Sequence, residues 1–325
     1  MKRIAVVGAG MMARIRARAF LATERAQICA VASRHRRTAR KLGSEVGCKL
    51  CFDDFRKLAE ASPDAVLVEV PHEAQEEIVL WALGLKLPVL IGGCLASSSA
   101  SAEKIIRRAR EKKVVVEAGY SERYNRTWEV ARKLVQEGRL GRIAAVRTIA
   151  LWDGDPRSWY YSQKPSGGMP LTHMTYCFIN AVRWVLGPPR LVSAFANRVR
   201  ETAPGMVAEE SCVANFVFGE NILCNMAASY IKPAAMNAWS ATFLGTEGAM
   251  EVFPEERQLV IYRLAKVSRR DFRSAPDPFE RQARVFLKAL DGPNECRNKP
   301  EDSIADVRIA EAIVKSAREK RTVSL

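Results

Sequence analysis

A glycine-rich turn between a short apolar run and a helical segment most constrains what this chain can fold into. Residues 4–7 are apolar, the next six read Gly-Ala-Gly-Met-Met-Ala, and residues 11–21 contain neither proline nor glycine. The turn fits G-x-G-x-x-G/A between a strand and a helix, where Gly8 permits the turn, Gly10 admits a pyrophosphate and Ala13 allows close packing. Free N–H groups at a helix start attract anions. We therefore predict a dinucleotide-binding turn formed by Gly8, Ala9, Gly10, Met11 and Met12.

Strands and helices alternate through the first third of the chain. We expect strands at residues 4–7, 27–32, 65–70, 88–91 and 114–118, with helices between most of them. Right-handed crossovers place such helices on both faces of a parallel sheet. The pattern predicts an α/β fold with an N-terminal Rossmann domain, a doubly wound parallel sheet, over residues 1–120.

The pattern changes after residue 120. A helix at 128–137 precedes strands at 143–150, 191–197, 212–218, 222–230, 239–243 and 259–262, and further helices are expected at 172–185, 278–290 and 303–320. Because most of these strands have no crossover helix between them, they are expected to pair antiparallel. We predict a C-terminal α+β domain over residues 121–325 with a large, mostly antiparallel sheet, its last helix packing back towards the first domain.

The chain of 325 residues is basic, with 51 Lys and Arg against 36 Asp and Glu and a net charge of +15. The excess suggests an anionic ligand. Since no nucleic-acid module and no basic segment interleaved with aromatics occurs, we expect no nucleic-acid partner. The most apolar stretch, residues 78–96, is broken by Lys86, Pro88 and a glycine pair, so we expect no membrane association.

Eight scattered cysteines fit reduced thiols in the cytoplasm better than a disulfide framework. The amino terminus runs directly into a strand pattern, so no signal peptide is expected. Cys48 and Cys51 form a C-x-x-C pair without a second pair or a histidine at zinc spacing. We interpret them as ordinary thiols and predict no metal site.

The end of the second predicted strand carries no carboxylate for a ribose 2′-hydroxyl. Residues 33–37 read Ser-Arg-His-Arg-Arg, and guanidinium groups bind phosphate oxygens bidentately. We predict NADP(H) in preference to NAD(H), with Ser33, Arg34 and Arg37 contacting the 2′-phosphate. A solvated helix face is the alternative interpretation of this basic cluster.

At this point the chain resembles the glucose-fructose oxidoreductase, inositol dehydrogenase and MocA-like family of NAD(P)-dependent oxidoreductases. Besides the glycine turn, the resemblance lies in the strand leading to Pro71, in residues 119–124 (G-[FY]-x-x-R-[FY]), in 138–143 (G-x-[IL]-G-x-[IV]), and in the hairpin at 245–248 (G-T-x-G). It extends over nearly the whole length. It implies that Pro71, Gln75, Gly92, Gly93 and Cys94 border the nicotinamide side of the cofactor.

The chain departs from the family at the positions that would be catalytic. The family's E-K-P triplet, whose Lys often relays the proton, corresponds here to Gly92, Gly93 and Cys94. The two glycines predict a wider pocket or a lost activity. A histidine four residues after the proline is replaced by Gln75. Cys94 could be a nucleophile only with a lowered pKa, and a buried inert thiol is the favoured interpretation.

The substrate helix of the family usually carries D-x-x-x-[HY], and here those places hold His173 and Cys177. Hydride transfer requires a proton donor or acceptor with a pKa near the working pH, which suits histidine. His173 is the candidate proton donor, with Tyr176 or Tyr120 assisting and Arg123 orienting an acidic group. The alternative is that His173 only forms a local hydrogen bond at the helix start.

Together these features predict an NADP(H)-dependent oxidoreductase acting on a small carbonyl, hydroxyl or imine compound. A non-catalytic NAD(P)-binding sensor or regulatory protein is the alternative, because the usual catalytic side chains are replaced. One face of the second domain's sheet cannot be covered by the first domain, so we expect a homo-oligomer, a dimer or tetramer.

Overall fold

The computed structural model describes the chain except residues 156, 167–175, 201–203, 208, 233–235 and 237–238. Contacts divide it into two compact units. Residues 1–121 and 276–307 form the first, and residues 122–275 and 308–325 form the second. No helix among the described residues is long and apolar enough to cross a membrane.

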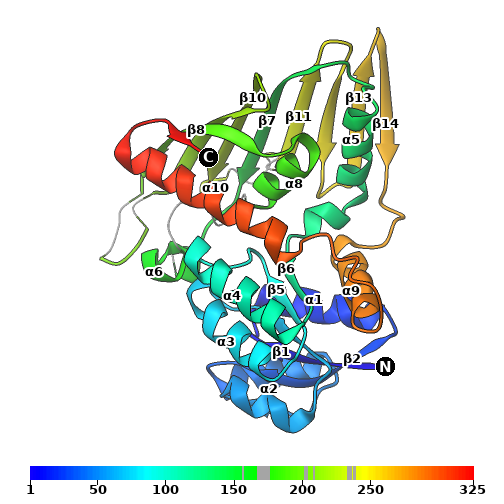
Figure 1. Cartoon of the computed structure of the whole chain (residues 1–325), viewed down its shortest axis with the longest axis vertical. Helices are drawn as coiled ribbons and strands as arrows, with labels where there is room; N and C mark the ends of the chain where they lie inside the picture. Colours follow the sequence, from blue (N-terminus) through cyan, green and yellow to red (C-terminus); the bar gives the residue numbers. More distant parts are fainter. Residues whose placement is uncertain (156, 167–175, 201–203, 208, 233–235, 237–238) are drawn as a thin grey trace. The chain divides into compact units, whose positions relative to one another are not determined.

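The first unit contains a six-stranded parallel sheet in the order β3-β2-β1-β4-β5-β6 (Figure 1). All its paired strands run parallel, which confirms the predicted Rossmann sheet. Its strands are β1 (Lys2–Val7), β2 (Ala26–Ala32), β3 (Cys51–Phe52), β4 (Ala65–Val68), β5 (Val89–Gly92) and β6 (Val116–Gly119). Only the two-residue β3 was not predicted, because it is too short to show a pattern.

Helices pack on this sheet, as the alternation of strands and helices along the sequence predicts. They are α1 (Met11–Ala22), α2 (Arg36–Glu45), α3 (His72–Gly84), α4 (Ser99–Lys112) and α9 (Pro278–Ala289), with the 3-10 helix η1 (Phe55–Ala61) after β3. Helices α3 and α4 contact each other, and α1 contacts α9, which lies beside it in Figure 1. The Phe20 and Phe286 rings meet edge to face at 6.1 Å within this core. Helix α9, which follows the second unit's strands in the sequence, thus completes the first unit's hydrophobic core.

The second unit contains a nine-stranded sheet in the order β14-β13-β12-β11-β7-β10-β9-β8-β15. Its strands are β7 (Ile143–Leu151), β8 (Pro189–Asn197), β9 (Ser211–Phe218), β10 (Ile222–Ser229), β11 (Trp239–Gly245), β12 (Ala249–Phe253), β13 (Gln258–Arg263), β14 (Lys266–Asp271) and β15 (Val323–Ser324). Every pair is antiparallel except β7 with β10, which confirms the predicted mostly antiparallel sheet. Strands β12, β14 and β15 were not predicted. The six residues of the edge strand β14 are all exposed and lack apolar alternation, and β15 has only two residues.

Helices cover one face of this sheet. The helices here are α5 (Arg126–Gln136), α8 (Tyr176–Leu186) and α10 (Pro300–Glu319), which contributes residues up to 307 to the first unit and the rest to the second, with the short η2 (Ser121–Tyr124), η3 (Trp159–Tyr161) and α6 (Gln163–Ser166) between strands. Trp128 of α5 packs against Phe178 of α8 and Phe243 of β11 at 5.9 and 6.1 Å. Strand residues on the opposite face, such as Phe195 and Leu223, are exposed.

Candidate functional site

The carboxyl ends of the parallel strands define the candidate site of the first unit. In doubly wound sheets, ligands bind outside these ends, at the point where the strand order reverses. Here the order reverses between β1 and β4. The turn after β1 contains Gly8 and Gly10, and β4 leads to Glu69 and Pro71. The sequence therefore places the predicted phosphate turn at the reversal itself.

Gly8 and Gly10 serve this turn in different ways. Gly8 has φ +108°, and a Cβ on it would lie 1.9 Å from the backbone carbonyl oxygen of Glu69. The Glu69 N–H in turn donates to the carbonyl of Val7 at 2.7 Å. Gly10 has φ −80°, and nothing in the described structure lies within 4 Å of a Cβ built on it. Gly8 is thus required by the fold, whereas Gly10 leaves open space in front of the turn.

The start of helix α1 offers its N–H groups to that space. Gly10 is the N-cap residue, and no side chain of the described residues caps the helix there. The first helical hydrogen bond, from Arg14 N–H to the Gly10 carbonyl, measures 3.2 Å. Earlier N–H groups at a helix start have no intrahelical partner, so the predicted residues Ala9, Met11 and Met12 lie where an anion is favoured.

The end of β2 presents the predicted 2′-phosphate residues. Ser33 Oγ lies 2.9 Å from Thr38 Oγ1, at the start of α2. Arg34 and Arg37 are exposed, and their side chains have no hydrogen bond or ion pair with any residue that the structure describes. Arg36, by contrast, donates from Nε to the Cys51 carbonyl at 3.2 Å. Two of the cluster's guanidinium groups are therefore available to a ligand, and a third is held by β3.

Three arginines of α1, Arg14, Arg16 and Arg18, follow the phosphate turn but do not form an open cationic surface. Arg14 and Arg18 both pair with Glu45. Arg16 is 2% exposed and lies inside the first unit. The positive charge of these three arginines is therefore largely neutralised within the protein.

Arg16 forms a buried network that the sequence analysis missed. Its Nε lies 2.6 Å from Glu69 Oε1, and the Glu69 side chain is only 8% exposed. Its remaining guanidinium nitrogens donate to Gln282 Oε1 at 2.7 Å and to the Gly119 carbonyl. The Phe279 ring lies 4.8 Å from the guanidinium carbon. One cation of α1 thereby joins the ends of β4 and β6 to helix α9.

The electrostatics of Glu69 reflect this burial. Burial raises the pKa of the Glu69 carboxyl to about 7, although the neighbouring Arg16 favours the ionised form. His72, three residues on, is also buried, and burial lowers its pKa to about 4. The sequence does contain one feature that could have identified Glu69 as a candidate site residue. It is the ionisable residue within the otherwise apolar run 65–70.

Gly92 lies directly against the Glu69 carboxylate. A Cβ on Gly92 would stand 2.1 to 2.4 Å from the two oxygens and the carboxyl carbon of Glu69. The interpretation that two glycines leave a wider pocket is therefore wrong at position 92, since the side chain of Glu69 fills that volume. At the next position, Gly93 accepts a hydrogen bond from the Gly119 N–H at 2.9 Å.

Other predicted nicotinamide-side residues also meet at this edge. Gln75 of α3 is fully buried and donates from Nε2 to the Gly92 carbonyl at 2.8 Å. Pro71 is the N-cap residue of α3. Burial raises the pKa of the Cys94 thiol to about 12, which agrees with the inert interpretation. The structure thus brings Gln75 and Gly92 together, and holds Cys94 as a neutral thiol.

The C-x-x-C pair also behaves as ordinary thiols. Neither cysteine forms a disulfide, and burial raises the pKa of each thiol, that of Cys48 to about 11. The Cys51 thiol lies against the helix residue Gly43, whose Cβ would be 2.5 Å from its sulfur.

The predicted catalytic residues are distributed over both units. Tyr120 is buried in the first unit, and Asn298 donates from Nδ2 to its carbonyl at 2.8 Å. Arg123 is buried in the second unit, with its guanidinium carbon 6.0 Å from the Trp184 ring centroid. Tyr176 and Cys177 begin helix α8. His173 lies outside the described residues.

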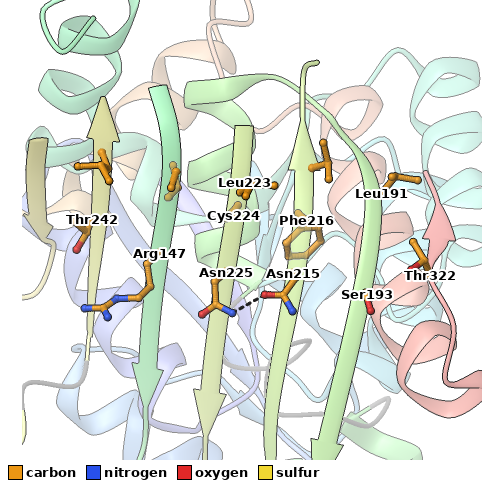
Figure 2. A pocket seen from close by; sticks show the side chains of 14 residues that line it. Arg147, Leu191, Ser193, Asn215, Phe216, Leu223, Cys224, Asn225, Thr242 and Thr322 are labelled. Carbon is orange, nitrogen blue, oxygen red and sulfur yellow. Dashed lines mark hydrogen bonds between the residues drawn. The ribbon is translucent and has the colours of Figure 1, made fainter. Parts of the chain in front are cut away.

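A pocket of about 660 Å³ occurs on the exposed face of the second unit's sheet. A polar row of residues crosses five neighbouring strands there, as Figure 2 shows, and Asn225 Nδ2 donates to Asn215 Oδ1 at 2.8 Å. The row consists of Ser193, Asn215, Asn225, Arg147 and Thr242.

Comparisons with known proteins agree with this geometry. Residues 2–120 match the oxidoreductase family with the NAD-binding Rossmann fold, and residues 128–251 match the GFO/IDH/MocA C-terminal domain. The chain belongs to the GFO/IDH/MocA family. It is therefore an NAD(P)-dependent oxidoreductase. The match confirms the resemblance stated from the motifs and favours an enzyme over the non-catalytic alternative.

The relatives of this oxidoreductase are distant, and some of them match most of its length. The inositol 2-dehydrogenase of Streptomyces avermitilis is 24% identical over 309 residues, covering 89% of this chain and 87% of that protein. A levoglucosan dehydrogenase solved with NADH has a TM-score of 0.90 at 18% identity, covering 99% and 98% of the two chains. The aldose-aldose oxidoreductase of Caulobacter crescentus, solved with glycerol, has a TM-score of 0.88 at 22% identity, covering 100% and 99%. The solved structures support the fold.

The two turn glycines allow a matched test. Gly8→Ala forces a Cβ against the Glu69 backbone at positive φ, so we expect it to destabilise the protein by about 2 kcal/mol or more. Gly10→Ala meets no protein atom, so its unfolding free energy should stay within about 0.5 kcal/mol of wild type. It should nevertheless weaken dinucleotide binding roughly tenfold or more, because the methyl occupies the open space. Urea denaturation and calorimetric titration measure both effects. Unchanged dinucleotide affinity in Gly10→Ala would contradict the placement of the pyrophosphate.

Proposed function

We propose that this oxidoreductase uses NADP(H) in preference to NAD(H) to transfer a hydride to or from a small carbonyl, hydroxyl or imine compound. The observation that carries the cofactor preference is the end of β2. Ser33 stands there with the exposed guanidinium groups of Arg34 and Arg37, and no carboxylate follows the strand before α2. Two free guanidinium groups suit a 2′-phosphate, whereas a ribose 2′-hydroxyl is usually held by Asp or Glu.

The residues at the strand ends fit a dinucleotide along its length. The space in front of Gly10 and the uncapped start of α1 suit a pyrophosphate. Pro71, Gln75, Gly92, Gly93 and Cys94 would border the nicotinamide half, which supplies the hydride chemistry when bound. The chain's own residues would then bind and orient the substrate and exchange one proton with it.

Replacing the two free arginines tests the cofactor preference. The variant Arg34→Ala/Arg37→Ala should lose NADPH affinity roughly tenfold or more, because charge-assisted contacts to the 2′-phosphate disappear. NADH affinity should change little. Arg40→Ala, which removes an exposed arginine further along α2, is the matched control. Equilibrium titrations with NADPH and NADH give the dissociation constants. Wild-type protein that binds NADH as tightly as NADPH would refute the preference.

For the proton step, we propose His173 as donor, with Tyr176 or Tyr120 assisting, Cys177 beside them and Arg123 orienting an acidic substrate group. The proposal rests on the correspondence with the substrate helix of the family, of which α8 (Tyr176–Leu186) is the described part. The similar proteins include an inositol 2-dehydrogenase and a levoglucosan dehydrogenase, so cyclic polyols and sugar ketones are the first compounds to test.

His173→Ala tests this assignment. Turnover with a compound that supports NADPH oxidation or NADP⁺ reduction should fall by roughly 10²- to 10⁴-fold, the usual contribution of a positioned acid or base. The dissociation constant for NADPH should stay unchanged, because His173 is not among the cofactor residues. His35→Ala, at the exposed start of α2, controls for loss of a histidine. Unaffected turnover in His173→Ala would discard His173 and leave the enzyme assignment standing.

We further propose that a second copy of the chain covers the exposed face of the nine-stranded sheet. Strand register places two largely apolar rows beside the polar row on the same face, and Figure 2 draws the first of them. One comprises Leu191, Val217, Leu223, Ala145 and Leu244, and the other contains Phe195, Val213, Ala227 and Ile149. A two-fold axis in the plane of this face sets apolar rows against apolar rows, as an isologous dimer requires.

Leu223→Glu tests this surface. Leu223 is 60% exposed in the middle of an apolar row, so a carboxylate there should convert the oligomer to monomers at micromolar concentration. Leu264→Glu, at the exposed turn between β13 and β14, is the control and should leave the assembly unchanged. Sedimentation velocity measures the molar mass of each variant. A wild-type monomer would refute the proposal.

A further inference from the structure

The Glu69 carboxylate, from the end of β4, lies where a side chain at position 92 of β5 would stand. In the family's E-K-P triplet the glutamate corresponds to position 92, at the end of β5. Here position 92 is glycine, and its Cβ would overlap the carboxylate of Glu69, which arrives from the end of β4. A side chain at position 92 and the Glu69 carboxylate therefore exclude each other.

The network around this carboxylate reaches the ends of three adjacent strands. Glu69 follows β4, Gly92 ends β5, and Gly119 ends β6. Arg16 pairs with the first and donates to the carbonyl of the third. Gln282, which accepts from Arg16, donates from its Nε2 to the carbonyl of Ala118 at 3.0 Å. The three ends are thus fixed relative to one another by buried contacts.

These strands form one half of the dinucleotide fold. A doubly wound sheet consists of two mononucleotide-binding halves, and the turn after β1 and the end of β2 belong to the adenosine half. The ends of β4, β5 and β6 therefore belong to the nicotinamide half. Because a buried guanidinium without its carboxylate is strongly unfavourable, the pair can hold these ends in one arrangement.

We propose that Glu69, through Arg16, is the positioning residue of the nicotinamide half, and that it replaces the side chain missing at position 92. The proposal rests on dinucleotide binding by this unit and is independent of the preference for NADP(H). It makes Glu69 and Gly92 a coupled pair. A carboxylate is needed at the carboxyl ends of these strands, and either position 69 after β4 or position 92 in β5 can supply it.

The coupling can be tested by placing a carboxylate at position 92 in place of the one at position 69. A Cβ at position 92 would lie 2.2 Å from the carboxyl carbon of Glu69, so an aspartate there places its own carboxyl group, one bond further on, near the same spot. The variants are Glu69→Ala, Gly92→Asp and the double variant Glu69→Ala/Gly92→Asp. Gly92→Asp alone crowds two carboxylates into one buried place, and Glu69→Ala alone leaves Arg16 unpaired.

Two ligands distinguish positioning from a general loss of structure. Intact NADPH uses both halves of the site, whereas 2′-phospho-ADP-ribose lacks only the nicotinamide ring. We expect Glu69→Ala to weaken NADPH about tenfold and 2′-phospho-ADP-ribose less than about twofold. The double variant should return NADPH affinity to within roughly threefold of wild type, since neighbouring sites are not additive.

A conservative pair covers the case in which Glu69→Ala does not fold. Glu69→Gln keeps the shape and removes the charge. Glu117→Gln makes the same change at a fully buried glutamate of β6. Only Glu69→Gln should lower NADPH affinity selectively. Equal losses for both ligands, no loss for either, or a double variant no better than Glu69→Ala would overturn the proposal.

The same titrations test the preference for NADP(H) separately from the positioning role of Glu69. If wild type binds NADH more tightly than NADPH, the preference fails, and NADH with ADP-ribose then replaces the first ligand pair with the same expected ratios. If wild type binds neither dinucleotide, the positioning role fails together with the cofactor site.

Discussion

A buried guanidinium is the constraint on which the candidate site depends. Arg16 lies on the helix that begins at the phosphate turn, yet it is 2% exposed, and a cation inside a protein must be paired and hydrogen-bonded. Glu69, Gln282 and the Gly119 carbonyl meet that requirement. Because Glu69 must turn inward to do so, its carboxylate takes the volume above Gly92. The glycine at the end of β5 is then a consequence of a charge on α1.

Much of the first unit could be predicted because its determinants are local. The strand, glycine turn and helix around Gly8 are set by apolar pattern and backbone sterics within some twenty residues. The side-chain network could not be predicted in the same way. Gln282 is 266 residues from Arg16, and no periodicity connects them. The net charge of +15 suggested an anionic ligand, whereas the structure pairs one of these positive charges, that of Arg16, with an internal carboxylate.

The second unit shows where pattern reading fails for physical reasons. Strands such as β9 alternate buried and exposed residues, and they were predicted nearly to the residue. Strand β14 is exposed on both faces, so nothing in its sequence distinguishes it from a loop, and its formation depends on pairing with β13. The parallel pairing of β7 with β10 is likewise invisible, because strand direction is decided by neighbours distant in sequence. His173, whose role the resemblance alone suggests, lies outside the described residues.

The return of the chain to its first unit has a consequence for how the site forms. Helix α9 supplies Gln282 to the network and Phe286 to the core, after the strands of the second unit have been made. The first 120 residues therefore contain the phosphate turn but not the partners that complete the burial of Arg16. Until residues 276–307 are present, the guanidinium lacks the side-chain amide of Gln282, and the ends of β4 and β6 lack their connection to α9. Contacts of such sequence separation form late because closing long loops costs entropy. The edge of the sheet proposed to bind the dinucleotide thus depends on residues 276–307 as well as on the first 120, although its recognisable motif occupies six residues.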